Sequence, residues 1–372
     1  MRWLSAIPIV IGVCASAAAQ TKLPDSVAGE MAAQSAPLNA IAENAQFSGS
    51  IGIVSGNVTE SWSYDHASPK LRQRNPKAGL WRWASVTKQV VAVLVMQEVA
   101  KGRIDLDQPI SRYLPKFAGA NAEKITVRYL LRHQSGLPNP DDVQASSEAM
   151  SAYYLPAYKG SRDPLTGYCA GTPKAEPGGN WAYNNCDYIV AGALLHAVTG
   201  KPWAKLVDER IARPLGLKNL SAFPTRKLTR SGWTGNRPEP EIDLASFGAS
   251  GGLYSSIEDM LGFDRALMSG ELLAKKELDV LWDGQPDLGF IALGQWVFEA
   301  PLKDCVAPVK LVERRGAIGG VQVRNFIAPD LQKAVAIFTD ASENDFSFGE
   351  IWQGAGFSHD VLNFALCSKE PS

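Results

Sequence analysis

Apolar and polar positions alternate at both ends of the chain in the period of a β-strand. Near the N-terminal end, residues 47–54 and 58–64 alternate and are separated by the turn sequence Ser55-Gly56-Asn57, which predicts a hairpin. Near the C-terminal end, four apolar segments are separated by turn-like residues. We expect strands over residues 289–298, 309–315, 321–327 and 334–339.

The middle of the chain has the spacing of helices instead. An apolar run over residues 90–100 stops at Gly102 and predicts a buried helix. Residues 136–180 are rich in Pro, Gly, Tyr and Ser, and we expect a long irregular stretch there. Further helices are expected over residues 127–133, 188–198 and 256–268, and a broken helical region over residues 348–366.

These patterns predict an α+β fold, an α/β sandwich in which one antiparallel sheet is built from both chain ends and flanked by helices. Residues 21–84 and 255–372 would form the lobe that contains this sheet. Residues 85–254 would be inserted as a mostly helical lobe. An active site would lie between the two lobes.

Composition narrows the classes of function. The chain has 372 residues, is 45% hydrophobic and 20% charged, and has a net charge of −1 without a block of like charges. Nothing therefore indicates a nucleic-acid partner. The four histidines are scattered and no Cys/His cluster has zinc spacing, so we expect no metal and no cofactor.

The N-terminus resembles a signal peptide. Arg2 precedes an apolar stretch over residues 3–13, and Ala17-Ala18-Ala19-Gln20 follows as a cleavage signal. The stretch is too short to span a bilayer, and no later segment is long and apolar enough. We expect residues 1–20 to be removed and the mature protein to be periplasmic or secreted.

Export would permit disulfides among the four cysteines that remain. Three pairings can be drawn, and the most local one joins Cys169 to Cys186 and Cys305 to Cys367. Four free buried thiols are the alternative.

The first candidate catalytic residues are Ser85 and Lys88, in the sequence Ser85-Val86-Thr87-Lys88. If a helix begins near Ser85, both side chains lie on one face of its first turn. A serine needs a nearby base to become a nucleophile, and an amine can take that role. The alternative is an N-cap serine followed by a solvated lysine.

Four further stretches occur in a fixed order after Ser85, and the ordered set resembles the penicillin-recognising serine hydrolases. The resemblance is closest to the class C β-lactamase and D-alanyl-D-alanine carboxypeptidase group, which also contains esterases and D-amino-acid peptidases. It extends from about Phe47 to about Thr339. The stretches are Ile104 to Pro115, Leu130 to Pro138, Pro177 to Asn185 and Gly251 to Ser256.

The resemblance implies a role for each matching residue. Ser85 would be the nucleophile and Lys88 its lysine partner, while Tyr183 would be a general base or acid. Asn185 would contact the substrate and Lys88. Backbone N–H groups of Ser85 and Ala317 would hold the oxyanion.

Apart from the resemblance, elementary electrostatics bears on Tyr183, and other interpretations of Tyr183 and Asn185 remain open. Nearby cations should lower the pKa of Tyr183, so that its phenolate could accept a proton. The alternatives are a loop tyrosine that caps a core and, for Asn185, the N-cap of the following helix.

One element departs from the family pattern. Where the family has K-T-G or H-x-G, this chain has Arg314-Arg315-Gly316-Ala317. Gly316 has no side chain to prevent a ligand from approaching the strand, and the arginines could bind an anionic group of the substrate. Neighbouring residues of a strand point to opposite faces, so we expect one arginine to face the site and the other to face away or to pair with an acidic residue. The alternative is an arginine pair that forms salt bridges with Glu313 or with aspartates.

We therefore predict an exported serine hydrolase that forms an acyl-enzyme on a small-molecule or peptide substrate with an ester, amide or peptide bond. A peptidase or esterase is favoured over a class C-like β-lactamase because of Arg314 and Arg315. A non-hydrolytic sensor on the same scaffold is the alternative from another class. His133, Asp105 and Asp107 are interpreted as structural residues.

Overall fold

A six-stranded antiparallel sheet joins the two ends of the chain, as the computed structural model shows for residues 36–65, 79–144, 150–227, 229–235 and 237–367. The strand order is β2-β1-β11-β10-β9-β8, so the N-terminal hairpin pairs with the last strand. The predicted fold class is confirmed, while the predicted signal peptide lies outside the described residues. The strands are β1 (Ser48–Ser55), β2 (Val58–Asp65), β8 (Trp296–Ala300), β9 (Val309–Ile318), β10 (Val321–Ala328) and β11 (Lys333–Thr339).

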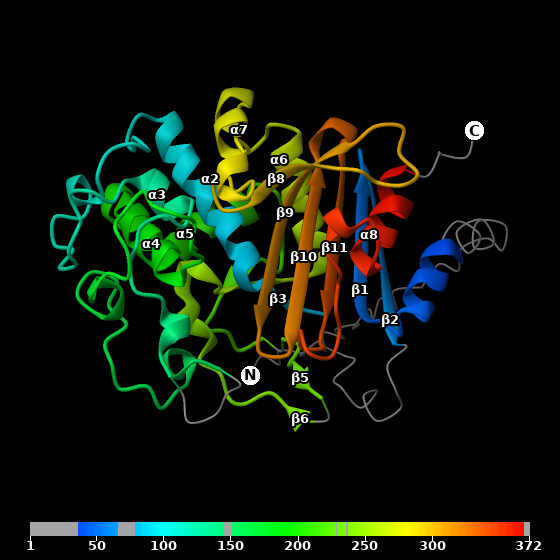
Figure 1. The fold of residues 1–372 in the computed structure, drawn as a ribbon, viewed down its shortest axis with the longest axis horizontal. Helices are drawn as coiled ribbons and strands as arrows, with labels where there is room; N and C mark the ends of the chain where they lie inside the picture. Colours follow the sequence, from blue (N-terminus) through cyan, green and yellow to red (C-terminus); the bar gives the residue numbers. More distant parts are fainter. Residues whose placement is uncertain (1–35, 66–78, 145–149, 228, 236, 368–372) are drawn as a thin grey trace, which may run out of the picture.

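Helices cover both faces of this sheet (Figure 1). On one face, α6 (Ile257–Met268) packs against β1 and β11. It approaches so closely that a Cβ at Gly52 would lie 2.8 Å from Leu261 Cδ1. On the other face lie α8 (Phe357–Leu362) and a helix over residues 36–44, whose apolar side chains form a second buried cluster with the sheet. All eight residues of β10 are buried as a result.

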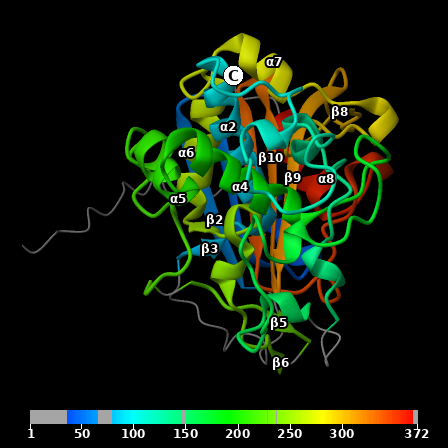
Figure 2. The ribbon, with the colours of Figure 1, turned by 90° about the vertical axis from the view of Figure 1, so that its left-hand side faces the viewer.

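The remaining elements lie beside the sheet. A small sheet has the order β3-β7-β4, and the β5–β6 hairpin lies at one end of the molecule (Figure 2). These short strands are β3 (Trp81–Arg82), β4 (Ser221–Ala222), β5 (Trp233–Thr234), β6 (Arg237–Pro238) and β7 (Leu253–Ser255). The helices are α2 (Thr87–Ala100), α3 (Val127–Leu131), α4 (Asn185–Thr199), α5 (Trp203–Val207) and α7 (Lys275–Leu281).

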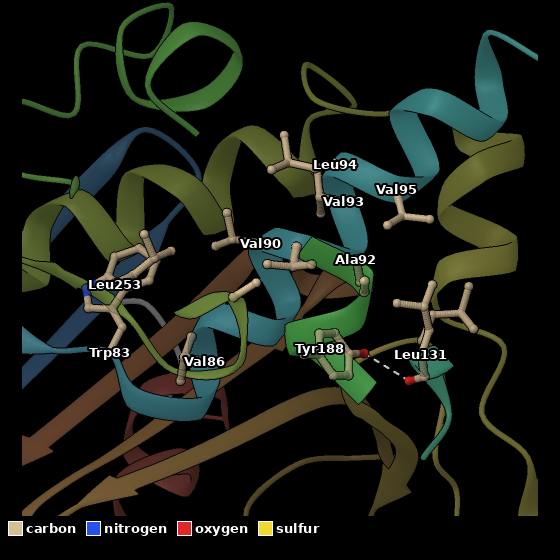
Figure 3. Close-up of a cluster of buried hydrophobic side chains, with 14 of the residues drawn as sticks. Trp83, Val86, Val90, Ala92, Val93, Leu94, Val95, Leu131, Tyr188 and Leu253 are labelled. Atoms are coloured by element: carbon tan, nitrogen blue, oxygen red, sulfur yellow. Dashed lines mark hydrogen bonds between the residues drawn. The ribbon is translucent and has the colours of Figure 1, made fainter. Parts of the chain in front are cut away.

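Helix α2 is buried on nearly every side. Its apolar side chains contact neighbours from α3, α4 and β7, including Leu131, Tyr188 and Leu253 (Figure 3). The Tyr188 hydroxyl donates to the Leu131 carbonyl at 2.9 Å and fixes α4 to the end of α3. The helix follows a 3₁₀ turn, Ala84–Val86, close to the predicted start near Ser85. Dense packing around α2 therefore fixes the position of its first turn.

One predicted strand is partly wrong. Only residues 296–300 of the apolar segment that begins at residue 289 form a strand. Gly289, Phe290 and Gly294 have φ values of 68°, 65° and 84°, which an extended strand does not allow. The division into two lobes stays a prediction, since one buried cluster contains both Val90 of α2 and Val323 of β10.

The four cysteines form two disulfides in the most local pairing. Cys169–Cys186 attaches the irregular segment to α4, and Cys305–Cys367 attaches the loop after β8 to the C-terminal helical region. In the described part of the chain, no helix has the length and apolar character needed to cross a bilayer.

A buried polar network connects α2, α6 and the sheet. Asn325 of β10 donates to Gln89 of α2 at 3.1 Å and to Asp264 of α6 at 2.8 Å, and Gln89 donates to Gln295 at 2.8 Å. Burial raises the pKa of Asp264 to about 8. The carboxyl group is therefore protonated in the folded protein at neutral pH.

We predict that Asp264→Asn flattens the pH dependence of stability. The pKa of Asp264 is about 8 when folded and about 3.9 when unfolded, so the folded state binds more protons between these values. The free energy of unfolding of the wild type should therefore fall as pH rises through this window. Urea unfolding at about pH 5 and about pH 8 measures the slope. Asp279→Asn, at an exposed position on α7, should keep the wild-type slope, and a similar slope in Asp264→Asn would contradict the assignment.

Candidate active site

Three residues from two distant segments of the chain meet at the start of α2. Lys88 Nζ lies 3.0 Å from Ser85 Oγ, and the Tyr183 hydroxyl lies 2.5 Å from Ser85 Oγ and 2.6 Å from Lys88 Nζ. Ser85 and Tyr183 are partly exposed, whereas Lys88 is 0% exposed. The structure thus places a reachable hydroxyl beside a buried amine and a phenol.

Two other oxygen atoms hold Lys88. Its Nζ donates to Asn185 Oδ1 and to the Ser250 carbonyl, each at 2.7 Å. Both oxygens can only accept hydrogen bonds, and a neutral amine has two N–H groups and one lone pair. When these oxygens take both N–H groups, the lone pair faces the hydroxyls of Ser85 and Tyr183.

The charge state of this group follows from burial. Burial and the Arg314 guanidinium hold the pKa of Lys88 well below its usual range. Burial raises the pKa of Tyr183 by more than Arg314 and the Ser85 hydrogen bond lower it. The prediction of a lowered phenol pKa is therefore wrong, and both shifts favour the neutral forms of the amine and the phenol.

The two arginines of β9 point to opposite faces of the strand. Arg314 is 1% exposed, and it donates to the Ser85 carbonyl at 3.0 Å and to the Tyr183 hydroxyl at 3.4 Å. Arg315 donates to Glu313 at 3.1 Å and through two nitrogens to Glu350 at 2.8 Å each. Arg314 therefore belongs to the site, and the guanidinium of Arg315 is occupied by carboxylates.

Strand β9 also passes very close to the nucleophile candidate. A Cβ at Gly316 would lie 2.7 Å from the Ser85 backbone nitrogen. The pairing of β8 with β9 ends at Glu313, so the part of β9 that contains Gly316 and Ala317 extends beyond β8. An oxyanion hole needs backbone N–H groups beside the reacting oxygen, and this approach suits that use. The donor role of Ala317 stays a prediction.

Buried groups behind Tyr183 have structural contacts. The His133 ring centroid lies 4.8 Å from that of Tyr183, and His133 Nδ1 lies 2.9 Å from Asp187, which also accepts from Ser135. Burial lowers the pKa of His133 and raises that of Asp187. Both shifts favour the neutral forms of this pair, and the His133 ring packs against Tyr183.

The two acidic residues interpreted as structural make local contacts. Asp105 accepts the backbone N–H of Asp107 at 3.0 Å, and Asp107 pairs with Arg128. Within the described ranges, no three His, Cys, Asp or Glu side chains are grouped closely enough to hold a metal ion.

Sequence reasoning missed Asp141 and Tyr154. Asn185 Nδ2 donates to the two Asp141 oxygens at 3.0 and 3.1 Å and to the Tyr154 hydroxyl at 2.9 Å. This contact orients the amide, so that its oxygen must face Lys88. Asn184, rather than Asn185, is the N-cap of α4. Asp141 lies in the irregular segment, where no periodic pattern marks it.

The chain is similar to known hydrolases over most of its length. The Beta-lactamase family model matches residues 46–353. The D-alanyl-D-alanine-carboxypeptidase/endopeptidase AmpH of Escherichia coli (strain K12) is 29% identical over 226 residues, which are 59% of this chain and 57% of that protein. Esterase EstB of Burkholderia gladioli is 32% identical over 172 residues, 40% of each chain. These two alignments thus span about half of each relative's length.

A solved structure shares the fold. D-amino acid amidase from Ochrobactrum anthropi SV3, complexed with D-phenylalanine, superposes with a TM-score of 0.72 at 21% sequence identity, covering 89% of this chain and 99% of that chain.

We predict that Arg314→Met moves the pH dependence of Ser85 reactivity toward higher pH. The Arg314 charge lowers the pKa of Lys88, so its removal should raise that pKa, and the acid limb should shift upward by about one pH unit. The rate of labelling by a fluorophosphonate, measured across pH, reports this limb. Arg315→Met changes the same charge on the opposite face of β9 and should leave the limb in place. A wild-type limb in Arg314→Met would contradict the assignment.

Proposed function

The chain belongs to the beta-lactamase family of serine hydrolases, and on that premise we propose that it hydrolyses an ester, amide or peptide bond through an acyl-enzyme on Ser85. The observation that carries the proposal is the contact of the partly exposed Ser85 hydroxyl with the buried amine of Lys88 and the phenol of Tyr183. A peptidase or esterase is the favoured activity.

In the first step, Ser85 Oγ attacks the substrate carbonyl carbon. The serine proton moves to the neutral amine of Lys88, either directly or through the Tyr183 hydroxyl, which contacts both atoms. The carbonyl oxygen becomes an oxyanion, which the backbone N–H groups of Ser85 and Ala317 would bind. Collapse of this intermediate breaks the bond to the leaving group, which takes the proton back from Lys88 through Tyr183.

In the second step, water attacks the ester that Ser85 now carries. The same amine accepts a proton from water and returns it to Ser85 Oγ as the acyl group leaves as an acid. The cycle needs no external base, because Lys88 returns to its neutral form after each half-reaction. The guanidinium of Arg314 keeps the protonated amine unfavourable in both half-reactions.

The preference for a peptidase or esterase rests on β9. The family's K-T-G position is Arg314-Arg315-Gly316 in this chain, and the two guanidinium groups replace a lysine and a small hydroxyl residue. The relatives named carboxypeptidase and esterase are in line with this preference. Two disulfides support the further proposal of an oxidising compartment, either the periplasm or the exterior of the cell.

We predict that Ser85→Ala abolishes covalent labelling by a fluorescent phosphonate and the release of p-nitrophenol from p-nitrophenyl acetate. Tyr183→Phe keeps the ring but removes the proton relay, and it should slow acylation by about 10²-fold. Single-turnover kinetics of the burst measure that step. The matched control is Tyr113→Phe, whose hydroxyl contacts Asp105 outside the site and whose loss should leave the burst rate unchanged.

Two results would contradict the proposed function. Label that remains in Ser85→Ala would remove Ser85 as the nucleophile. Failure of every ester, amide and β-lactam probe to label the wild type, with ligand binding retained, would favour a non-hydrolytic sensor on the same scaffold.

A further inference from the structure

We propose that Asp141 forms a subsite for a positively charged amino group of the substrate, close to the scissile bond. The inference depends on the proposed function, because it places this subsite beside the same nucleophile. It names a substrate class: esters, amides or peptides that carry a free, protonated amine.

Asp141 is an exposed carboxylate whose partners are all neutral. It accepts hydrogen bonds from Asn185 at 3.0 and 3.1 Å, from the Tyr154 hydroxyl at 2.8 Å and from Asn139 at 3.4 Å. Among the residues that the structure describes, no Lys, Arg or His lies within ion-pair distance of it. The undescribed residues 145–149 that follow are Ala-Ser-Ser-Glu-Ala and contain no cation. Within the described part of the chain, the negative charge of Asp141 is thus held in place without a cationic partner.

The neighbouring Asp142 shows the contrast. Its carboxylate lies 3.8 Å from Lys174, and the two form an exposed ion pair. Two adjacent aspartates on one 3₁₀ turn (Pro140–Asp142) therefore differ in charge environment. Asp141 contacts Asn185 and, among the described residues, has no cation within ion-pair distance.

The carboxylate of Asp141 is well fixed before any ligand binds. Tyr154 is 1% exposed, and its ring stacks on Phe247 with centroids 3.9 Å apart and planes 2° apart. Asn185 is held by α4 and by its contact with Lys88. A charged group that is already oriented loses little conformational freedom on binding, which favours recognition of a small ammonium group.

Asn185 connects Asp141 to the chemistry. Its Oδ1 accepts from Lys88 Nζ, while its Nδ2 donates to Asp141, so a single side-chain amide separates the carboxylate from the amine beside Ser85. An ammonium group at Asp141 would therefore belong to the substrate being cleaved. Asn185 then positions both the amine of Lys88 and the carboxylate of Asp141.

The electrostatics of the site support the same ligand. Asp141 raises the pKa of Lys88, in opposition to burial and Arg314. A bound ammonium would neutralise Asp141 and so favour the free amine of Lys88. The arginines do not supply an equivalent site for an anion, because Arg314 is buried behind Tyr183 and Arg315 is paired with Glu350.

Two matched substrate pairs test the subsite at about pH 6.5, where an α-amino group is mostly protonated. In one pair, phenylalanine methyl ester is compared with its N-acetyl derivative, each in both enantiomers. In the other, 3-(dimethylamino)propyl acetate, whose amine is protonated at this pH, is compared with its neutral carbon analogue, 4-methylpentyl acetate. The quantity measured is the ratio of kcat/KM for the charged substrate to that for the neutral one, which cancels any general loss of activity.

We predict that the ratio for at least one pair falls by about tenfold or more in Asp141→Asn, as expected when the charged partner of an ion pair is neutralised. The pair that responds shows whether the amine lies in the acyl part or in the leaving group. Asp142→Asn makes the same change at the neighbouring position and should keep the wild-type ratio. Ratios that are unchanged in Asp141→Asn for both pairs would overturn the subsite and leave the serine hydrolase intact.

A binding measurement keeps the subsite testable without turnover. Phenylalaninamide should bind Ser85→Ala protein at least about tenfold more tightly than N-acetylphenylalaninamide in calorimetry, and adding Asp141→Asn should remove the difference. Equal affinities in the single variant would overturn the subsite whether or not any ester is hydrolysed. If the wild type hydrolyses none of the substrates but the difference in affinity is observed, the result would instead count against the proposed function.

Discussion

The proposed chemistry of this protein depends on the burial of one amine, that of Lys88. Lys88 has no exposed surface, and the oxygens of Asn185 and Ser250 that contact it can only accept hydrogen bonds. With a guanidinium nearby as well, the environment disfavours an ammonium group and directs a lone pair toward two hydroxyls. The serine proposed as the nucleophile thus lies beside an amine whose surroundings favour its deprotonated form.

Packing from several parts of the fold holds that arrangement in place. The 3₁₀ turn before α2 supplies Ser85, and α2 itself supplies Lys88. Helix α2 is buried in the main hydrophobic cluster, so its first turn has little freedom. Strand β9 brings its glycine against the Ser85 backbone and its buried arginine against Tyr183. The phenol and the two acceptor oxygens come from α4, the loop before it and a 3₁₀ segment that ends at Ser250. The surroundings that lower the pKa of Lys88 therefore come from long-range packing rather than from a local motif.

Much of this could be predicted from the sequence, because hydrophobic periods and short motifs are local signals. The sheet built from both ends, the helix after Ser85, the local disulfides and the opposite faces of Arg314 and Arg315 follow from such patterns. The pKa of Tyr183 could not be predicted in this way, since its direction depends on a balance between burial and nearby charge. Lys88 donates to the backbone carbonyl of Ser250. Because any residue type has this carbonyl, the sequence could not indicate the contact. Asp141 lies in a segment without a period, so only the folded structure brings it to Asn185.

The charge state of Lys88 can be measured directly. Protein labelled with ¹⁵N in the lysine side chains gives an Nζ resonance for each lysine, and the signal missing from Lys88→Met assigns the one that matters. A titration by NMR should show this Nζ as a neutral amine at pH 7, with its transition well below that of the exposed lysines. An Nζ that stays an ammonium group until the other lysines titrate would contradict the account, because no free base would then be present beside Ser85.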